Sequence, residues 1–189
     1  PPPTPEEDAA LRDALELLLA TPMIARRPLA NEIAQAIEPS EAVDASHAIL
    51  CNIRNTRFNE MEYSVPADVG MACVREIMDT IAEGIDVSFP LEVRYVAGED
   101  TWLAMSEGGP RVSISIHDFA ERDFRPFFDR IEPIFARYGG RPHWGKVHGL
   151  AAGELRELYP RFDDFRRIRA DLDPTGRFLN DHLRTILDA

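Results

Sequence analysis

The stretch Val112-Ser113-Ile114-Ser115-Ile116-His117 alternates apolar and polar side chains without interruption. Successive side chains of a β-strand point to opposite faces of a sheet. The pattern therefore predicts a strand with one buried face and one polar face, as in a half-exposed antiparallel sheet. Gly108-Gly109-Pro110 is typical of a turn that leads into this strand. Residues 87–96, before the turn, read as a further strand.

Helical patterns lie on either side of these strands. Between residues 68 and 84 apolar residues recur every fourth position, with an Asp at the start and a Gly at the end as capping residues. A second helical pattern covers residues 123–139 and again ends in glycine. Residues 58–65 read as a strand ahead of both helices, and residues 48–53 as a shorter one.

Strand, helix, strand, strand and helix thus follow one another from about Phe58 to Tyr138. This order is typical of a ferredoxin-like unit, so the predicted fold class is α+β, an antiparallel sheet with helices on one face. We assign residues 1–45 to an N-terminal helical segment and residues 46–138 to the sheet domain. Residues 139–189 are predicted to form a mostly helical C-terminal tail with too few apolar residues for a core of its own, so we expect it to pack on another part of the protein.

Composition excludes several classes of protein. The formal net charge of −12 argues against a nucleic-acid partner, which would need clustered Lys and Arg. No apolar run approaches the roughly 20 residues of a transmembrane helix. Cys51 and Cys73 lack metal-ligand spacing and indicate a reducing compartment. We therefore expect a cytoplasmic protein, or one bound peripherally at a membrane. Because the sequence opens on prolines without a methionine, we also expect a truncated or processed chain.

Candidate binding residues follow from the strand alternation. Glu92 and Arg94 are two apart and share a face, an acceptor and donor pair that suits a polyhydroxylated ligand. The same spacing fits an ordinary surface ion pair. If residues 111–117 lie beside this strand, Ser115 and His117 adjoin the pair and place a possible general acid or base there. The alternative is a half-exposed strand with a solvated polar face.

The hexapeptide from Arg141 to Lys146 contains two bulky rings, a Gly and a Lys. Read by itself, it also fits a structural loop with a buried Trp144. His143 and His148 are five apart without a nearby carboxylate or thiol that would complete a closed metal site, so no metal is expected. The glycine-rich fingerprint of dinucleotide-binding proteins does not occur in the sequence.

Several motifs together resemble a known family. They are His143-Trp144-Gly145-Lys146, Tyr159-Pro160-Arg161-Phe162, residues 172–180, residues 57–66, and Phe89-Pro90-Leu91-Glu92-Val93-Arg94. Over residues 53–187 the chain resembles the C-terminal part of the D-arabinono-1,4-lactone oxidase family, which includes gulonolactone, galactonolactone and alditol oxidases among the vanillyl-alcohol-oxidase-type flavoproteins. The resemblance implies an FAD cofactor and a sugar lactone or polyol as substrate.

In such enzymes an N-terminal domain binds FAD, a cap domain covers the flavin, and the chain end returns to the flavin domain. The resemblance thus makes residues 46–138 the cap, or substrate-binding domain, and residues 139–189 the returning tail. It implies that the FAD-binding domain is not in these residues and belongs to the same longer chain or to a separate one. We expect this chain alone to be inactive.

The resemblance also implies roles for particular residues. Glu92 and Arg94 match a Glu-x-Arg pair that contacts substrate hydroxyls, and Arg94 would lower the pKa of the hydroxyl being oxidised. His117 would take its proton, with Ser115 as the other candidate for that position. Lys146 matches a lysine beside the pyrimidine end of the flavin, where a fixed cation would stabilise the negative charge of the reduced ring.

His143 and Trp144 are the further candidates for contact with the cofactor. The function that these matches imply is oxidation of a CH–OH group by FAD, with oxygen as the acceptor. The alternatives are a flavin-dependent dehydrogenase with another acceptor, and a non-catalytic module that binds a ligand or a partner.

Overall fold

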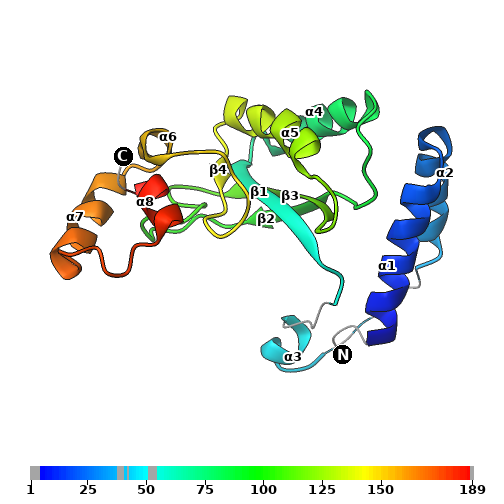
Figure 1. Cartoon of the computed structure of the whole chain (residues 1–189), viewed down its shortest axis with the longest axis horizontal. Coiled ribbons are helices and arrows are strands. Elements are labelled where there is room, and N and C mark those ends of the chain that lie inside the picture. Colours follow the sequence, from blue (N-terminus) through cyan, green and yellow to red (C-terminus); the bar gives the residue numbers. More distant parts are fainter. Residues whose placement is uncertain (1–4, 38–40, 42, 51–54, 188–189) are drawn as a thin grey trace.

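The computed structural model describes residues 5–37, 41, 43–50 and 55–187. Its centre is one four-stranded antiparallel sheet with the spatial order β2-β3-β1-β4 (Figure 1). The strands are β1 (Phe58–Pro66), β2 (Glu92–Val96), β3 (Arg111–Phe119) and β4 (Arg141–Pro142).

Two helices connect these strands. Helix α4 (Gly70–Ala82) lies between β1 and β2, and α5 (Arg125–Arg137) lies between β3 and β4. The resulting order β-α-β-β-α-β is that of the ferredoxin-like fold. The predicted α+β class is therefore confirmed. The capping glycines are also where the sequence predicts them, since Gly84 and Gly139 follow the two helices with φ of 116° and 64°.

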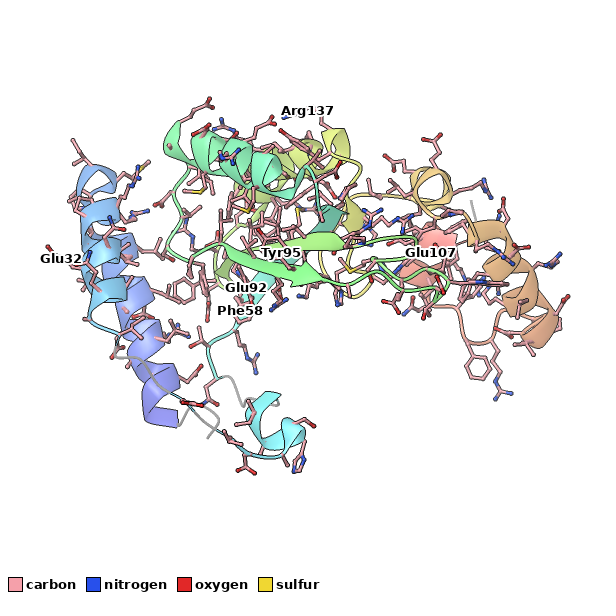
Figure 2. All side chains as sticks on the ribbon, turned by 180° about the vertical axis from the view of Figure 1, so that it is seen from behind. Glu32, Phe58, Glu92, Tyr95, Glu107 and Arg137 are labelled. Carbon is pink, nitrogen blue, oxygen red and sulfur yellow. The ribbon has the colours of Figure 1, made fainter. Side chains whose placement is uncertain are left out.

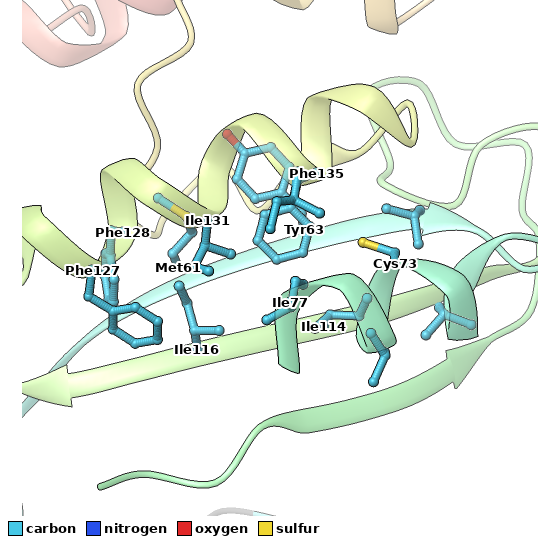
Figure 3. Packing of buried hydrophobic residues seen from close by; sticks show 14 residues of the cluster. Met61, Tyr63, Cys73, Ile77, Ile114, Ile116, Phe127, Phe128, Ile131 and Phe135 are labelled. Atoms are coloured by element: carbon cyan, nitrogen blue, oxygen red, sulfur yellow. The ribbon is translucent and has the colours of Figure 1, made fainter. Parts of the chain in front are cut away.

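The buried face of the sheet carries the apolar half of each alternating strand. Met61, Tyr63 and Val65 of β1 and Val112, Ile114 and Ile116 of β3 are almost fully buried, together with residues of α4 and α5 (Figure 3). Helix α4 approaches β3 closely at Gly70, where a Cβ atom would lie 2.4 Å from Cγ2 of Val112. Since both helices cover this face, the polar half of each strand is left on the other face.

Two predicted strands differ in the structure. Residues 48–50 belong to a short helix, α3 (Ser46–Leu50), whereas residues 51–53 lie outside the described residues. A short apolar run does not distinguish helix from strand by itself, which explains this wrong prediction. Strand β2 begins at Glu92 and not at residue 87. Pro90 has no N–H to donate to a sheet ladder, so regular pairing begins only after it.

The N-terminal helices α1 (Pro5–Ala20) and α2 (Met23–Gln35) pack together at one end of the molecule (Figure 1). Polar contacts connect them to the sheet domain. Asp8 Oδ2 accepts hydrogen bonds from the backbone N–H groups of Asn55 and Thr56, at 2.9 and 3.1 Å. Arg26 donates to the carbonyl oxygen of Val87 at 2.9 Å.

The tail contains α6 (Ala152–Leu158), α7 (Phe162–Leu172) and α8 (Asp181–Leu187) at the opposite end (Figure 1). It buries a small apolar cluster, which includes Leu155, Tyr159 and Ile186. Leu103 and Trp144, from outside these helices, pack against that cluster. None of the described helices is long and apolar enough to cross a membrane.

Candidate functional site

The register of β2 and β3 brings the predicted site residues together. Glu92 pairs with Ser115 and Arg94 pairs with Ser113, so the four side chains lie on one face. His117 lies on the same face two residues further along β3. The predicted neighbourhood of the Glu-x-Arg pair and the polar half of β3 is therefore confirmed. Figure 2 labels Glu92 on β2, on the side of the sheet away from α4 and α5.

Strand β1 adds residues that the sequence analysis did not select. Glu60 pairs with His117, and Glu62 pairs with Ser115. We use the term polar face for eight side chains that β1, β2 and β3 present away from the core, together with Lys146, whose ammonium lies against two of them. The eight are Glu60, Glu62, Ser64, Glu92, Arg94, Ser113, Ser115 and His117.

Glu62 contacts four side chains of the site. Its side chain is only 8% exposed. Oε1 accepts a hydrogen bond from the hydroxyl of Ser113, and Oε2 accepts one from Ser115 at 3.0 Å. Oε2 also accepts a hydrogen bond from Lys146 Nζ and lies 3.6 Å from Arg94 Nη1. Glu62 thus links both cations of the site to the hydroxyl groups of β3.

Glu60 forms a second link, between His117 and Lys146. Its Oε1 lies 3.3 Å from Nε2 of His117 and accepts a hydrogen bond from Lys146 Nζ. Burial alone would raise the pKa of Glu60, but the hydrogen bonds from His117 and Lys146 outweigh it and lower this pKa to about 2. Burial alone would also raise the pKa of Glu62, but the hydrogen bonds from Lys146 and Ser113 outweigh this effect and lower the pKa below its ordinary value.

Backbone hydrogen bonds determine where Lys146 lies. Beyond β4 the chain continues along the edge of β1, since His143 N donates to the carbonyl oxygen of Glu62 at 2.9 Å and Val147 N donates to that of Glu60 at 3.0 Å. Lys146 is the only lysine in the 189-residue sequence. The extended edge segment therefore places it over the two carboxylates of β1.

His143 and Trp144 line a cavity of about 320 Å³ beside Glu62 and Ser113. The Trp144 indole N–H donates to the carbonyl oxygen of Leu103 at 2.8 Å. Its ring lies 5.1 Å from that of Tyr159, which connects the site to the tail. These contacts fit the structural-loop alternative, and the role of both residues toward a cofactor stays a prediction.

Three residues of the polar face also have the composition of a metal site. Glu60, Glu92 and His117 each offer one ligand atom, and these atoms lie within 4.8 Å of one another. Lys146 and Arg94 already form ion pairs with the two carboxylates. Because cations of the chain occupy these carboxylates, we do not assign a metal to the cluster.

A family model described as D-arabinono-1,4-lactone oxidase matches residues 10–186. The chain belongs to this family.

Curated relatives agree with that assignment. An L-gulono-1,4-lactone dehydrogenase of Mycobacterium tuberculosis is 36% identical over 85% of this chain and 38% of its own length. An alditol oxidase of a Streptomyces species is 37% identical over 68% of this chain and 31% of its own length. Mouse L-gulonolactone oxidase is 28% identical over 77% of this chain and 34% of its own length. The chain thus spans about a third of the length of these lactone oxidase family members.

Glu60 and Glu62 are the residues that the sequence reasoning missed. The signal was available, since both alternate with Met61 and Tyr63 in the same way as Ser113 and Ser115 alternate with their neighbours. What the sequence could not supply was the strand order. Because β1 lies between β3 and β4 in the sheet, Glu60 and Glu62 lie between the polar side chains of β3 and Lys146.

Proposed function

We propose that this chain is the substrate-binding part of an FAD-dependent oxidase that acts on a CH–OH group of a sugar lactone or polyol. The observation that carries the proposal is the meeting of Arg94, His117 and Lys146 on one polar face. The family assignment supports it, since its relatives are named for sugar lactones and alditols. Such ligands need many donors and acceptors on one surface, and this face offers both.

Arg94 is the residue that we assign to the reacting oxygen of the substrate. Its guanidinium is half exposed and forms ion pairs with Glu62 and Glu92, which orient it. A positive charge held there favours the loss of the hydroxyl proton. Glu92, also half exposed, is free to accept a hydrogen bond from a neighbouring hydroxyl with its other oxygen. Ser115 is almost fully buried and donates its hydroxyl to Glu62, so it positions the carboxylate that orients Arg94.

His117 is the residue that we assign to the proton. The polar face holds three carboxylates, Glu60, Glu62 and Glu92, against two cations, Lys146 and Arg94, so one negative charge is left over when His117 is neutral. A proton that arrives on His117 removes this imbalance. Nε2 of His117 faces the carboxylate of Glu60, so Nδ1 is the ring atom that can accept the proton.

The donor chemistry of the site fits one end of a flavin. Lys146 is the group that would contact it, because an ammonium suits the oxygen and nitrogen atoms of the pyrimidine ring. The flavin, when bound, supplies the acceptor for the hydride of the carbinol carbon. Since the sequence lacks a dinucleotide fingerprint, we propose that most of the FAD is held by a domain outside these residues. In this proposal residues 46–138 act as the cap and residues 139–189 contact the FAD-binding domain.

A dehydrogenase is the second candidate, because one of the relatives above is named a dehydrogenase. The test is an assay of the complete protein, this chain joined to its FAD-binding domain, with a panel of sugar lactones and alditols. We expect oxygen consumption that matches substrate oxidation. Turnover with an artificial electron acceptor but not with oxygen would establish the dehydrogenase. Turnover with neither acceptor would leave a ligand-binding module. A cytoplasmic location stays a prediction from cysteine usage.

A further inference from the structure

A second cavity, of about 340 Å³, lies where β1 and β2 end and β3 begins, next to the cavity lined by His143 and Trp144. It is lined by the last residue of β1, Pro66, by Arg111 at the start of β3 and by Arg141 of β4. Glu107, Pro160 and the turn residues 108–110 complete its wall. Arg111 is six residues from His117 along β3, which corresponds to about 20 Å. The cavity is therefore separate from the cluster of Glu60, His117 and Lys146.

Backbone carbonyl groups hold both guanidinium groups in place. Arg141 donates to the carbonyl oxygens of Leu158 and Glu107, at 2.9 and 2.8 Å, and lies 4.9 Å from the centre of the Tyr159 ring. Arg111 donates to the carbonyl oxygens of Ser64 and Gly139, at 2.9 and 3.2 Å. These contacts fix the positions of the two cations without neutralising their charge.

Other partly buried arginines have carboxylate partners. Arg26 pairs with Asp86, Arg122 with Asp118, and Arg166 with Asp163. In the part of the chain that the structure describes, no carboxylate oxygen lies within 4 Å of the guanidinium of Arg111 or Arg141.

This exception has an energetic cost. Arg141 is only 7% exposed, and a buried charge without a counterion in direct contact is unfavourable. Burial lowers the pKa of Arg111, and the nearby charge of Arg141 lowers it further. Two cations that repel each other in one cavity would be stabilised by an anion bound between them.

We propose that Arg111 and Arg141 form a binding site for a small oxyanion, a phosphate or carboxylate group of a ligand. Guanidinium groups bind such groups through paired, charge-assisted hydrogen bonds. Glu107 modulates the site. Its Oε2 is buried and accepts no hydrogen bond from the described residues, and its negative charge opposes a second anion nearby.

The experiment measures the binding of inorganic phosphate and, separately, of D-gluconate to this chain by calorimetry at constant ionic strength. We expect saturable binding of one anion per chain. The Arg111→Gln variant should weaken it at least about tenfold, as expected for the loss of a charge-assisted contact. Arg75→Gln is the matched control, because Arg75 is exposed on α4 and its loss changes the net charge equally.

Glu107→Gln provides an independent arm, since it leaves both arginines intact and should tighten binding severalfold. If Arg111→Gln lowers the melting temperature, weaker binding could reflect a damaged fold, and the affinity of the Glu107→Gln variant then decides the test. Tighter binding of phosphate than of gluconate would assign the site to phosphate groups, and the reverse order to carboxylates. The proposal is overturned if neither anion binds saturably, if Arg75→Gln weakens binding as much as Arg111→Gln, or if Glu107→Gln leaves the affinity unchanged. The two arginines would then serve only to bind backbone carbonyl groups.

Discussion

His117 lies directly across the β1–β3 ladder from Glu60, with its Nε2 atom 3.3 Å from Oε1. Phe58 and Phe89 pack against the imidazole, with ring centres 5.1 and 5.8 Å away. The side chain of His117 is therefore only 10% exposed and has little freedom to rotate. A single carboxylate and two aromatic rings thus fix the orientation of the residue to which we assign the proton.

The first prediction concerns acid stability. Because the pKa of Glu60 falls from its ordinary 4.5 to about 2 in the folded chain, its ionised form stabilises the fold above pH 4.5. That contribution is lost as the pH falls from about 4.5 to about 2. We expect the free energy of unfolding to decrease over this window, and to decrease less in Glu60→Gln. Urea unfolding at a series of pH values measures both. Parallel pH profiles for the two proteins would show that Glu60 does not contribute.

The second prediction concerns Glu62 as the residue that positions Lys146. Since Lys146 is the only lysine, labelling with ¹⁵N-lysine gives a single side-chain amine signal. In the wild-type chain the contacts with Glu60 and Glu62 should slow exchange of the amine protons with water. Glu62→Gln should accelerate that exchange. Glu76→Gln is the control, because Glu76 pairs with Arg137 elsewhere and its loss changes the charge equally. An exchange rate unaffected by Glu62→Gln would contradict the positioning role.

The third prediction concerns the core that supports the polar face. Ile77 of α4 is fully buried between the helices and the sheet. Truncation to Ala should lower the free energy of unfolding by about 2–5 kcal/mol. Met78, its neighbour on α4, is 51% exposed, and Met78→Ala should change stability by less than about 0.5 kcal/mol. Equal effects of the two substitutions in urea unfolding would be inconsistent with the described packing.

The sequence predicts the sheet well because strand alternation and helix periodicity are local patterns. It predicts for the same reason that Glu92 and Arg94 share a face of one strand, and Ser115 and His117 a face of another. That the two strands are neighbours was a condition of the predicted site, and their register confirms it. Strand order is not local, so the central position of β1 and the roles of Glu60 and Glu62 are visible only in the structure. The helix at residues 46–50 was missed because five residues are too few for a period to be recognised.

The fourth prediction concerns the chain by itself. Without a dinucleotide fingerprint it should not bind FAD tightly, and it should not oxidise sugar lactones or alditols. The measurement is the visible absorption spectrum of the purified chain after addition of FAD and removal of unbound cofactor. Retention of one flavin per chain would contradict the proposal that another domain holds most of the FAD.

The central claim is that the polar face is where the substrate is oxidised, and rapid-mixing measurements of flavin reduction in the complete enzyme test it most directly. Lys146→Met should slow reduction by roughly two to three orders of magnitude, more than it weakens substrate binding, because the charge it stabilises develops during the reaction. Lys146→Arg keeps the cation and should recover part of the rate. Arg94→Ala should impair both binding and rate. Reduction of the Lys146→Met enzyme at the wild-type rate would contradict the account and leave residues 143–146 as a structural loop.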